Sequence, residues 1–520
     1  MALLRSIATV GGYTMISRVL GFARDILIAA ILGAGPVADA FFVAFKLPNF
    51  FRRLFAEGAF NAAFVPLFSR RLEGEGFEPA RRFAAEVLAV MVTGLFLFVT
   101  VLQIAMPIAM LAMAPGFRDD PEKFELAVAL ARITFPYLLF ISLVSHLGGV
   151  LNSLGRFAAA AATPIILNLC LIAALLLATP FLPTAGHALA WGVTGGGIAQ
   201  FLWMIAACRR AGMHFALPRP RLTPGVRRLL RLMLPGAVGA GVVQINLMID
   251  IVIASLLPTG AVSFLYYADR VNQLPLGVVG VAVGTALLPL LSRQLRGGEE
   301  AAASASMNRA LEFSLLLTVP GAAALVVIAG PVIVTLFERG AFGAGESAAT
   351  AAALAAYAIG LPAYVLVKVL GPGFFAREDT ATPVKVAIGA VIVNVTLNLL
   401  LMGPLAHVGI ALATAIAAWL NAGALALILR RRGHLALDAR LKRSLPRIAA
   451  AAAAMATGLW GGMVVLAPLL ADGLAAQALA LAALVTGGLV LYFGCAIAFG
   501  AVGRDDLKRL LLRRRPPAGA

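Results

Sequence analysis

Apolar segments long enough to cross a membrane recur along the whole chain, and they constrain its fold more than any other feature. Scanned for helices of about 20 residues, the length that spans a bilayer, the sequence predicts fourteen spans. Soluble domains carry roughly 25% charged residues, whereas this chain has 13%, with 61% hydrophobic residues. The sequence therefore indicates an all-α polytopic membrane protein. The predicted spans lie near residues 8–33, 37–68, 83–113, 124–152, 158–180, 186–207, 231–257, 260–293, 309–337, 347–375, 382–402, 406–429, 447–469 and 474–500.

The positive charges orient these spans. The net charge is +18, but the basic residues lie in short connections between apolar segments instead of on one face of a soluble fold, so nucleic-acid binding is not expected. Alternate connections hold nearly all of them, and the opposite ones contain only Arg118, Lys123 and Arg339. Because basic loops stay in the cytoplasm, both termini are predicted to be cytoplasmic. The main basic segments are a linker (208–230), a loop (430–446) and a tail (501–520).

Short matches in the same order suggest an internal duplication. Leu47-Pro48 corresponds to Leu274-Pro275, Asp25 to Asp250, and the Ala-Thr-Pro at 162–164 to that at 381–383. A six-helix unit returns the chain to its starting side, so two copies share one orientation and are related by an axis along the membrane normal. We therefore predict an N-terminal lobe (1–207), a C-terminal lobe (231–429) and a cleft between them. The last two helices (447–500) lie outside the repeat, where support of a lobe is their simplest role.

Ionisable residues inside the predicted spans are the main functional signal, because each costs about 2.5–3.5 kcal/mol at the bilayer centre. One interpretation is closed ion pairs that fasten helices together. However, the arginines outnumber the nearby carboxylates, and guanidinium groups bind phosphate oxygens bidentately. The excess therefore predicts a polyanionic ligand such as a diphosphate. The residues concerned are Arg18, Arg24, Asp25, Asp39, Lys46, Arg52, Arg53, Glu57, Asp250, Asp269, Arg270 and Lys368.

A second polar group within the spans contains Asp250, Asn394, Asn398 and Thr414. Their carboxylate, amide and hydroxyl oxygens are suitable ligands for a small hard cation such as sodium. The alternative is a cluster of hydrogen bonds between helices. Both interpretations stay open at this point.

Several motifs resemble the MurJ (MviN) family of lipid II flippases, within the MOP exporter superfamily. They are SRVLGFARD at 17–25, ADAFF at 38–42, KLPNFFRRLFAEGAF at 46–60 and YADR at 267–270. Lys46 stands where this family more often has arginine. The resemblance implies a transporter, not an enzyme. It would move lipid II, an undecaprenyl-diphosphate-linked peptidoglycan precursor, from the inner to the outer leaflet of the bacterial cytoplasmic (inner) membrane by alternating access.

The resemblance also implies roles for individual residues. Central-cavity residues essential for transport would be Arg18, Arg24, Asp39, Arg52 and Arg270, with Arg53, Asp25 and Ser17 nearby. The terminal helix pair would form a groove for the lipid tail. The energy source would be a sodium ion or the membrane potential, without another cofactor. Expected partners are lipid II and the cell-wall synthesis or division machinery, and the chain is expected to be a monomer.

For the transport cycle, we expect Asp25, Asp39 and Asp269 to pair with the arginines when no substrate is bound. Two other functions remain open at the sequence level. One is export of another lipid-linked oligosaccharide by the same kind of transporter. The other is a membrane-embedded polyprenyl-phosphate transferase, but such enzymes need carboxylate or histidine clusters, and the short outer loops offer only Asp119-Asp120.

Overall fold

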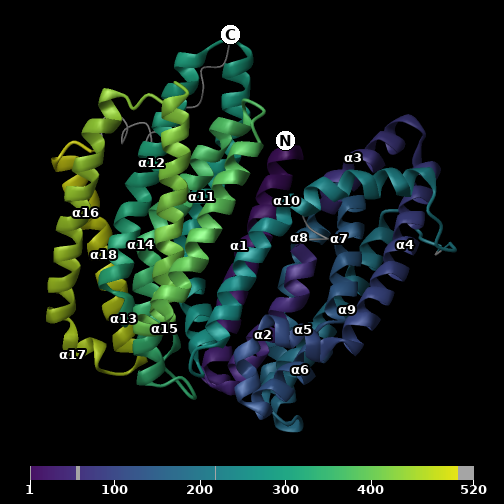
Figure 1. Cartoon of the computed structure of the whole chain (residues 1–520), viewed down its shortest axis with the longest axis horizontal. Helices are drawn as coiled ribbons and strands as arrows, with labels where there is room; N and C mark the ends of the chain where they lie inside the picture. The colour runs from purple at the N-terminus through teal and green to yellow at the C-terminus, as the bar shows by residue number, and fades with distance from the viewer. Residues whose placement is uncertain (1, 54–58, 217, 502–520) are drawn as a thin grey trace. The chain divides into compact units, whose positions relative to one another are not determined.

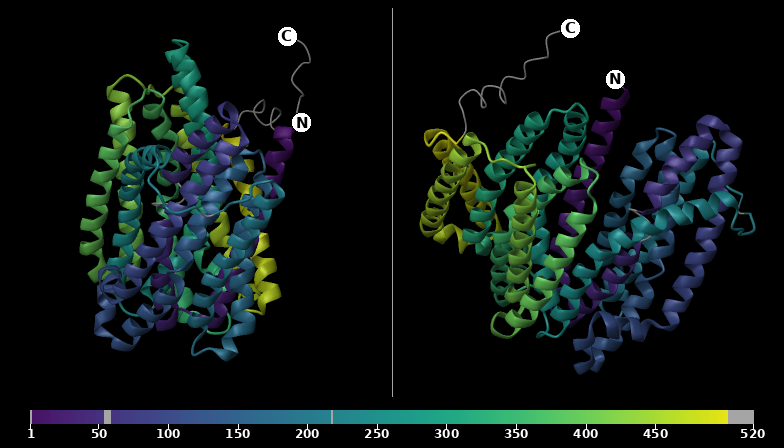
Figure 2. Two further views of the ribbon diagram at one scale, coloured as in Figure 1. Left: turned by 90° about the vertical axis from the view of Figure 1, so that its right-hand side faces the viewer. Right: turned by 45° about the horizontal axis from the view of Figure 1, so that its top comes forward.

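The computed structural model describes residues 2–53, 59–216 and 218–501, which form helices joined by short connections (Figures 1 and 2). Contacts between Cα atoms divide the chain into two compact units. The first contains Met1–Ser263 and Arg339–Gly343, and the second contains Phe264–Glu338 and Ala344–Ala520. Each unit therefore has its own packed core and is described separately.

In the first unit, α1 packs against α8, α2 against α6, and both α7 and α8 against α9, while α10 lies on α3. Figure 1 shows these helices in purple to teal. Their bounds are α1 Ala2–Leu32, α2 Pro36–Phe51, α3 Ala59–Gly74, α4 Phe77–Ile104, α5 Met106–Met113, α6 Pro121–Thr134, α7 Tyr137–Ser153, α8 Phe157–Ala173, α9 Ala185–Arg210 and α10 Pro224–Ser255.

Capping residues explain where several of these helices begin. The Asp120 carboxylate accepts a hydrogen bond from the Lys123 backbone N–H at the start of α6, and Pro121 follows it directly. Thr223 caps α10 in the same way. Side-chain oxygens at this position satisfy N–H groups that the first helical turn leaves without partners, and proline is favoured immediately afterwards.

Two glycines allow an unusually close contact at the end of α1. The Ala341 N–H donates to the Ala30 carbonyl at 2.8 Å. A Cβ on Gly33 would lie 2.4 Å from the Ala341 oxygen, and one on Gly340 would lie 2.2 Å from the Ala30 oxygen. Both glycines also have positive φ, +63° and +59°, a conformation that larger residues rarely adopt. The connection at 339–343 therefore packs on α1 in a way that only glycine permits.

In the second unit, α14 packs against both α12 and α15, and α16 packs against α12 and α18. Glu312 of α12 accepts hydrogen bonds from Ser444 Oγ (2.5 Å) and Arg440 Nε, which anchors α16. The helix bounds are α11 Ala261–Arg296, α12 Glu300–Val327, α13 Ala329–Phe337, α14 Ala344–Phe375, α15 Ala381–Arg431, α16 Ala439–Val465, α17 Ala467–Leu470 and α18 Leu474–Ala498.

The start of α15 is fixed by Asp379. Its carboxylate accepts hydrogen bonds from the Thr382 hydroxyl (2.6 Å) and from Arg432 (2.6 Å). These bonds hold the pKa of Asp379 well below its usual value. The Ala-Thr-Pro motif at 381–383 thus begins a helix, as the sequence predicts.

Among the described residues, nine helices are long and apolar enough to cross a membrane. The chain is therefore an all-α multi-pass membrane protein. One of the nine, α15, has 51 residues and bends at Ala406, where φ is +48°. This bend lies at the first residue of the predicted span 406–429, directly after the span 382–402, so α15 contains two segments of membrane-spanning length.

Four predicted spans are less regular than the apolar pattern suggests. Short breaks divide 83–113 into α4 and α5, 124–152 into α6 and α7, and 309–337 into α12 and α13. The predicted span 37–68 is interrupted as well, because α2 ends at Phe51 and passes into a π-helical turn at Arg52 and Arg53. Pro48 lies just before this change, and a proline inside a helix removes one backbone N–H donor. Glu57 is outside the described residues.

Candidate functional site

A buried charge network joins α1 to α8 in the first unit. Arg24 donates to one oxygen of Asp25 through Nε (3.0 Å) and Nη2 (2.7 Å), and to Asn168 Oδ1 through Nη1 (2.8 Å). Asn168 in turn donates to the Ser17 carbonyl at 3.0 Å. Arg24 and Asp25 are only 8% and 2% exposed. The structure thus brings Ser17, Arg24 and Asp25 together and holds them with an amide from another helix.

A second buried network surrounds Asp39 at the start of α2. One carboxylate oxygen accepts from Lys123 Nζ (2.9 Å) and the Gly260 N–H (2.8 Å), and the other accepts from the Ser263 N–H (3.0 Å) and Oγ (2.6 Å). Lys123 also lies 4.2 Å from the centre of the Phe117 ring. Asp39 therefore fastens α6 and the connection between α10 and α11 to α2.

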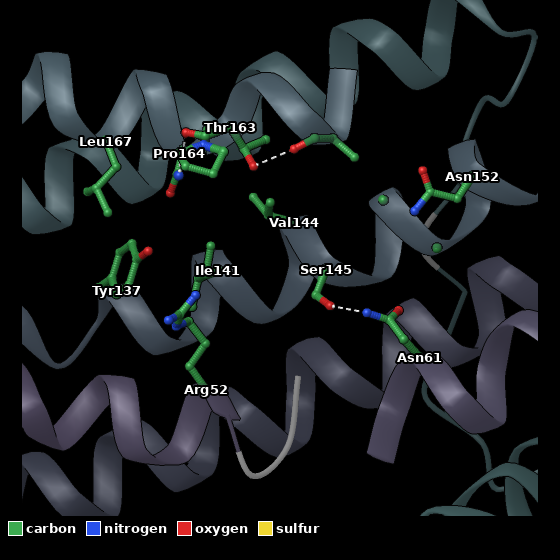
Figure 3. A pocket seen from close by; sticks show the side chains of 14 residues that line it. Arg52, Asn61, Tyr137, Ile141, Val144, Ser145, Asn152, Thr163, Pro164 and Leu167 are labelled. Carbon is green, nitrogen blue, oxygen red and sulfur yellow. Dashed lines mark hydrogen bonds between the residues drawn. The ribbon is translucent and has the colours of Figure 1, made fainter. Parts of the chain in front are cut away.

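A cavity of about 240 Å³ lies in the first unit, lined by residues of α2, α3, α7, α8 and α9. Arg52 extends from the end of α2 toward Tyr137 and Ile141 of α7, and Asn61 donates to Ser145 Oγ at 3.1 Å (Figure 3). A permanently charged guanidinium at the edge of a polar cavity can bind an anion there. Arg52 is one of the arginines that the sequence predicts to bind a polyanionic ligand, and the structure places it at such a cavity.

The other predicted charged residues are divided between the two units, with Arg18 and Arg53 in the first. Arg18 is exposed on α1, and Arg53 is exposed beside Arg52. In the second unit, Arg270 donates to the Tyr266 hydroxyl at 3.0 Å and lies 4.8 Å from the centre of that ring. Its neighbour Asp269 accepts a hydrogen bond from Gln273.

The residues predicted to bind sodium are divided between the units. Asp250 is half-buried on α10 of the first unit, whereas Asn394 and Asn398 are buried one turn apart on α15 of the second. Thr414 donates to the Ile410 carbonyl at 2.9 Å, a bond within its own helix. The sodium site stays a prediction.

Sequence reasoning missed Lys123, Asn168 and Gln200. Lys123 is assigned from the sequence to an outer loop, but it is 5% exposed inside α6. Asn168 and Gln200 are amides in otherwise apolar helices, at 5% and 1% exposure. A buried amide needs hydrogen-bond partners. Uncharged polar residues inside these spans could therefore have been predicted from the sequence to take part in a buried polar network.

Together these groups can bind an anion and a neutral polar group, but they do not form a recognisable catalytic set. Arginine supplies fixed donors for phosphate oxygens. The carboxylates Asp25 and Asp39 already accept hydrogen bonds from basic partners, and among the described residues no cluster of three His, Cys, Asp or Glu could hold a metal ion. The chemistry available is therefore reversible binding of a charged, polar ligand.

Comparisons with known proteins cover nearly the whole chain. Residues 28–479 match the family described as lipid II flippase MurJ. A "Probable lipid II flippase MurJ" from Rhizobium meliloti (strain 1021) is 48% identical over 519 residues, which is 99% of this chain and 97% of the relative. The "Lipid II flippase MurJ" of Burkholderia cenocepacia is 38% identical over 521 residues, covering 99% of this chain and all of the relative (100%).

Solved structures agree with these matches. One described as "Lipid II flippase MurJ, inward closed conformation" superposes with a TM-score of 0.78 at 25% identity and covers 97% of this chain and 99% of its own. An inward-facing multidrug transporter of the MATE family, within the MOP superfamily, gives a TM-score of 0.65 at 16% identity, covering 82% of this chain and 97% of its own. The second comparison is evidence of a shared fold alone.

Proposed function

This chain belongs to the MurJ family of lipid II flippases, and from that premise we propose that the arginines within its spans bind the diphosphate of lipid II during transport. Because the chain belongs to this family, it is a transporter and not an enzyme, and the alternative of a polyprenyl-phosphate transferase is rejected. The observation that supports arginine binding is the position of Arg52 at the edge of a cavity whose wall contains polar side chains such as Asn61, Ser145 and Gln200. Lipid II would move from the inner to the outer leaflet of the bacterial inner membrane by alternating access of the lobes 1–207 and 231–429.

Arg24 would act by exchanging partners. Two of its nitrogens now donate to a single Asp25 oxygen, which is an arrangement that a phosphate oxygen can also accept. A diphosphate would therefore compete with Asp25 for the guanidinium, and Asp25 would take it back after release. Arg18, Arg53, Arg270, Asp39 and Asp269 stay proposed members of the substrate path.

The number of spans supports the same architecture. Counting α15 as two spans and adding α1, the α2–α3 segment, α10 and α11 to the other apolar helices gives the fourteen predicted from the sequence. The proposed repeat also gains support, because α4 and α12 each run for 28 residues before a break and a short second helix. Both termini would be cytoplasmic, and most of the basic tail (501–520) lies outside the described residues.

The last helix pair is suited to contact lipid. Trp460 and Val464 of α16 are 63% and 62% exposed, and Leu489 and Val490 of α18 are 54% and 70% exposed. Large apolar side chains at membrane depth normally face hydrocarbon or a lipid tail. These helices are therefore the proposed groove for the undecaprenyl chain, with the monomer as the transporting unit.

Sodium coupling can be tested with one matched pair of variants. If Thr414 helps bind sodium, Thr414→Val should raise the sodium concentration needed for half-maximal transport in proteoliposomes by about ten-fold, because one oxygen ligand is lost. Thr396→Val is the control, since Thr396 makes the same helical hydrogen bond from an exposed face of α15. Equal sodium dependence in both variants would exclude Thr414 as a ligand. Transport that does not depend on sodium in the wild-type protein would leave the membrane potential as the proposed energy source.

The flippase function itself is tested by locating the precursor. In cells depleted of this protein, lipid II is expected to accumulate in the inner leaflet, protected from a reagent added outside. Restoring the wild-type chain should return lipid II to the outer leaflet. If lipid II distribution were unchanged while another lipid-linked oligosaccharide accumulated, the alternative MOP-type exporter function would replace this one.

A further inference from the structure

The cavity beside Arg52 has features that diphosphate binding does not require. It extends from Arg52 past α7 to Thr163 of α8 (Figure 3). Gln200 of α9 also lines the cavity. It also reaches Asn152, at the end of α7 that precedes the basic Arg156 connection, which is the predicted cytoplasmic side. The space beyond Arg52 is therefore placed to receive part of a ligand that enters from the cytoplasm.

Two buried amide oxygens in the cavity wall have no hydrogen-bond partner among the described residues. Gln200 is 1% exposed, and its Nε2 donates to the Thr163 carbonyl at 2.7 Å, which fixes the orientation of the amide. Within the described part of the chain, its Oε1 is buried without a partner, as is Oδ1 of Asn61 in the same cavity wall. Leaving a buried acceptor without a donor costs about 1–3 kcal/mol. Such a pair of acceptors is suited to a ligand that brings O–H or N–H groups.

Much of the remaining wall is apolar. Ile141, Val144 and Leu167 contribute aliphatic surface. Gly149 lets α3 pack closely on α7, because a Cβ there would lie 3.1 Å from the Phe64 ring. A pyranose ring combines an apolar face with hydroxyl groups at its edge, so it can lie on such a surface while its edge reaches buried acceptors. The same wall offers nothing for a second phosphate, because Arg52 is the only basic residue that lines the cavity among the described residues.

We propose that this cavity binds the sugar that is attached directly to the diphosphate of the substrate. Gln200 Oε1 and Asn61 Oδ1 would accept hydrogen bonds from its hydroxyl or N-acetyl N–H groups while Arg52 holds the adjoining phosphate. This inference rests on the proposed diphosphate binding and extends it to the head group. Complete pockets for drug-sized ligands measure roughly 300–1,000 Å³, so a cavity of about 240 Å³ fits one sugar and not the whole head group.

The test compares two ligands that share the tail and the diphosphate. Dissociation constants of lipid II and of undecaprenyl diphosphate are measured on the purified full-length chain by native mass spectrometry. Gln200→Met is expected to weaken lipid II binding about three- to ten-fold, the range for one or two lost hydrogen bonds. Binding of undecaprenyl diphosphate, which has no sugar, should stay within about two-fold of wild type.

Gln103→Met is the matched control. Gln103 of α4 also donates through Nε2 to a backbone carbonyl, that of Arg132, at 2.7 Å, but it does not line the cavity. Its two dissociation constants should equal those of wild type. If Gln200→Met does not purify as a single species, the same comparison with Asn61→Leu decides the question.

Each result separates the two proposals. Equal weakening of both ligands, or unchanged binding of both, in the Gln200→Met or Asn61→Leu protein would overturn the sugar site and mean that the cavity holds water only. Failure of the wild-type protein to bind undecaprenyl diphosphate would instead contradict diphosphate binding. A selective loss for lipid II supports the sugar site.

Discussion

Replacing Arg24 with alanine is expected to abolish transport and to lower the amount of folded protein. Replacing Asp25 with alanine as well is expected to restore the amount of folded protein but not transport. Arg24→Ala leaves the Asp25 carboxylate 2% exposed without the guanidinium that now contacts it at 2.7 Å. Breaking a buried ion pair in this way costs about 3–5 kcal/mol. The single variant should therefore lose both stability and transport.

The double variant Arg24→Ala/Asp25→Ala separates these two effects. It removes both charges, so the amount of folded protein in the membrane should return to near the wild-type level. Transport should stay absent, because the diphosphate still lacks its guanidinium. Complementation of a strain depleted of its own lipid II flippase, read beside a membrane immunoblot, measures both quantities.

The contrary outcome is equally clear. If the double variant supports normal growth, Arg24 is only a structural partner of Asp25 and the closed ion pair is its whole role. Arg81→Ala serves as the control, because Arg81 pairs with Glu78 at 2.6 Å on an exposed part of α4. Its loss should leave growth unchanged, since exposed ion pairs contribute little to stability.

The sequence predicts an all-α multi-pass membrane protein correctly, because a membrane-spanning helix requires a long stretch of apolar residues that is visible in the sequence. It predicts the interruptions less well. The breaks between α4 and α5 and between α12 and α13 occur in apolar residues, where hydropathy gives no signal. Pro48, in contrast, marks the change of backbone before Arg52, since proline removes a helical N–H.

The sequence likewise identifies some residues of the candidate site and misses others. Charged residues inside spans are conspicuous because they are costly, so Arg24, Asp25 and Arg52 are identified from the sequence. Their partners are neutral or come from distant segments, as with Asn168, which lies 144 residues from Arg24. No local pattern connects such pairs, and only the packing of α1 against α8 brings them together.

Lys123 illustrates how a correct rule can misplace one residue. The positive-inside rule assigns a lysine at the start of a span to a loop, and the predicted span begins at residue 124. In the structure α6 begins at Pro121, and the Lys123 side chain is 5% exposed with its ammonium 2.9 Å from Asp39 Oδ2. Lys123 therefore neutralises a buried carboxylate inside the protein and does not indicate on which side of the membrane its segment lies.

Lys123→Met should consequently be among the most destabilising single changes in the chain. Methionine nearly conserves side-chain length, but the Asp39 carboxylate, 1% exposed, would keep its charge without a cation, a loss of about 3–5 kcal/mol. We expect a much shorter half-life of the purified protein at elevated temperature, the appropriate measure for a large protein that unfolds irreversibly. Lys385→Met, the same change at an exposed position on α15, should have no such effect.

A second change should reverse most of this loss. In Lys123→Met/Asp39→Asn the buried charge is gone, and the amide oxygen can still accept from the Gly260 N–H or from Ser263, which now bond to the carboxylate. Recovery of the half-life would identify uncompensated charge as the cause. If the double variant were as unstable as the single one, the contribution of Lys123 would lie in its packing on Phe117 and Thr259. In that case the donors of Gly260 and Ser263 would hold Asp39, and the network would not depend on a cation.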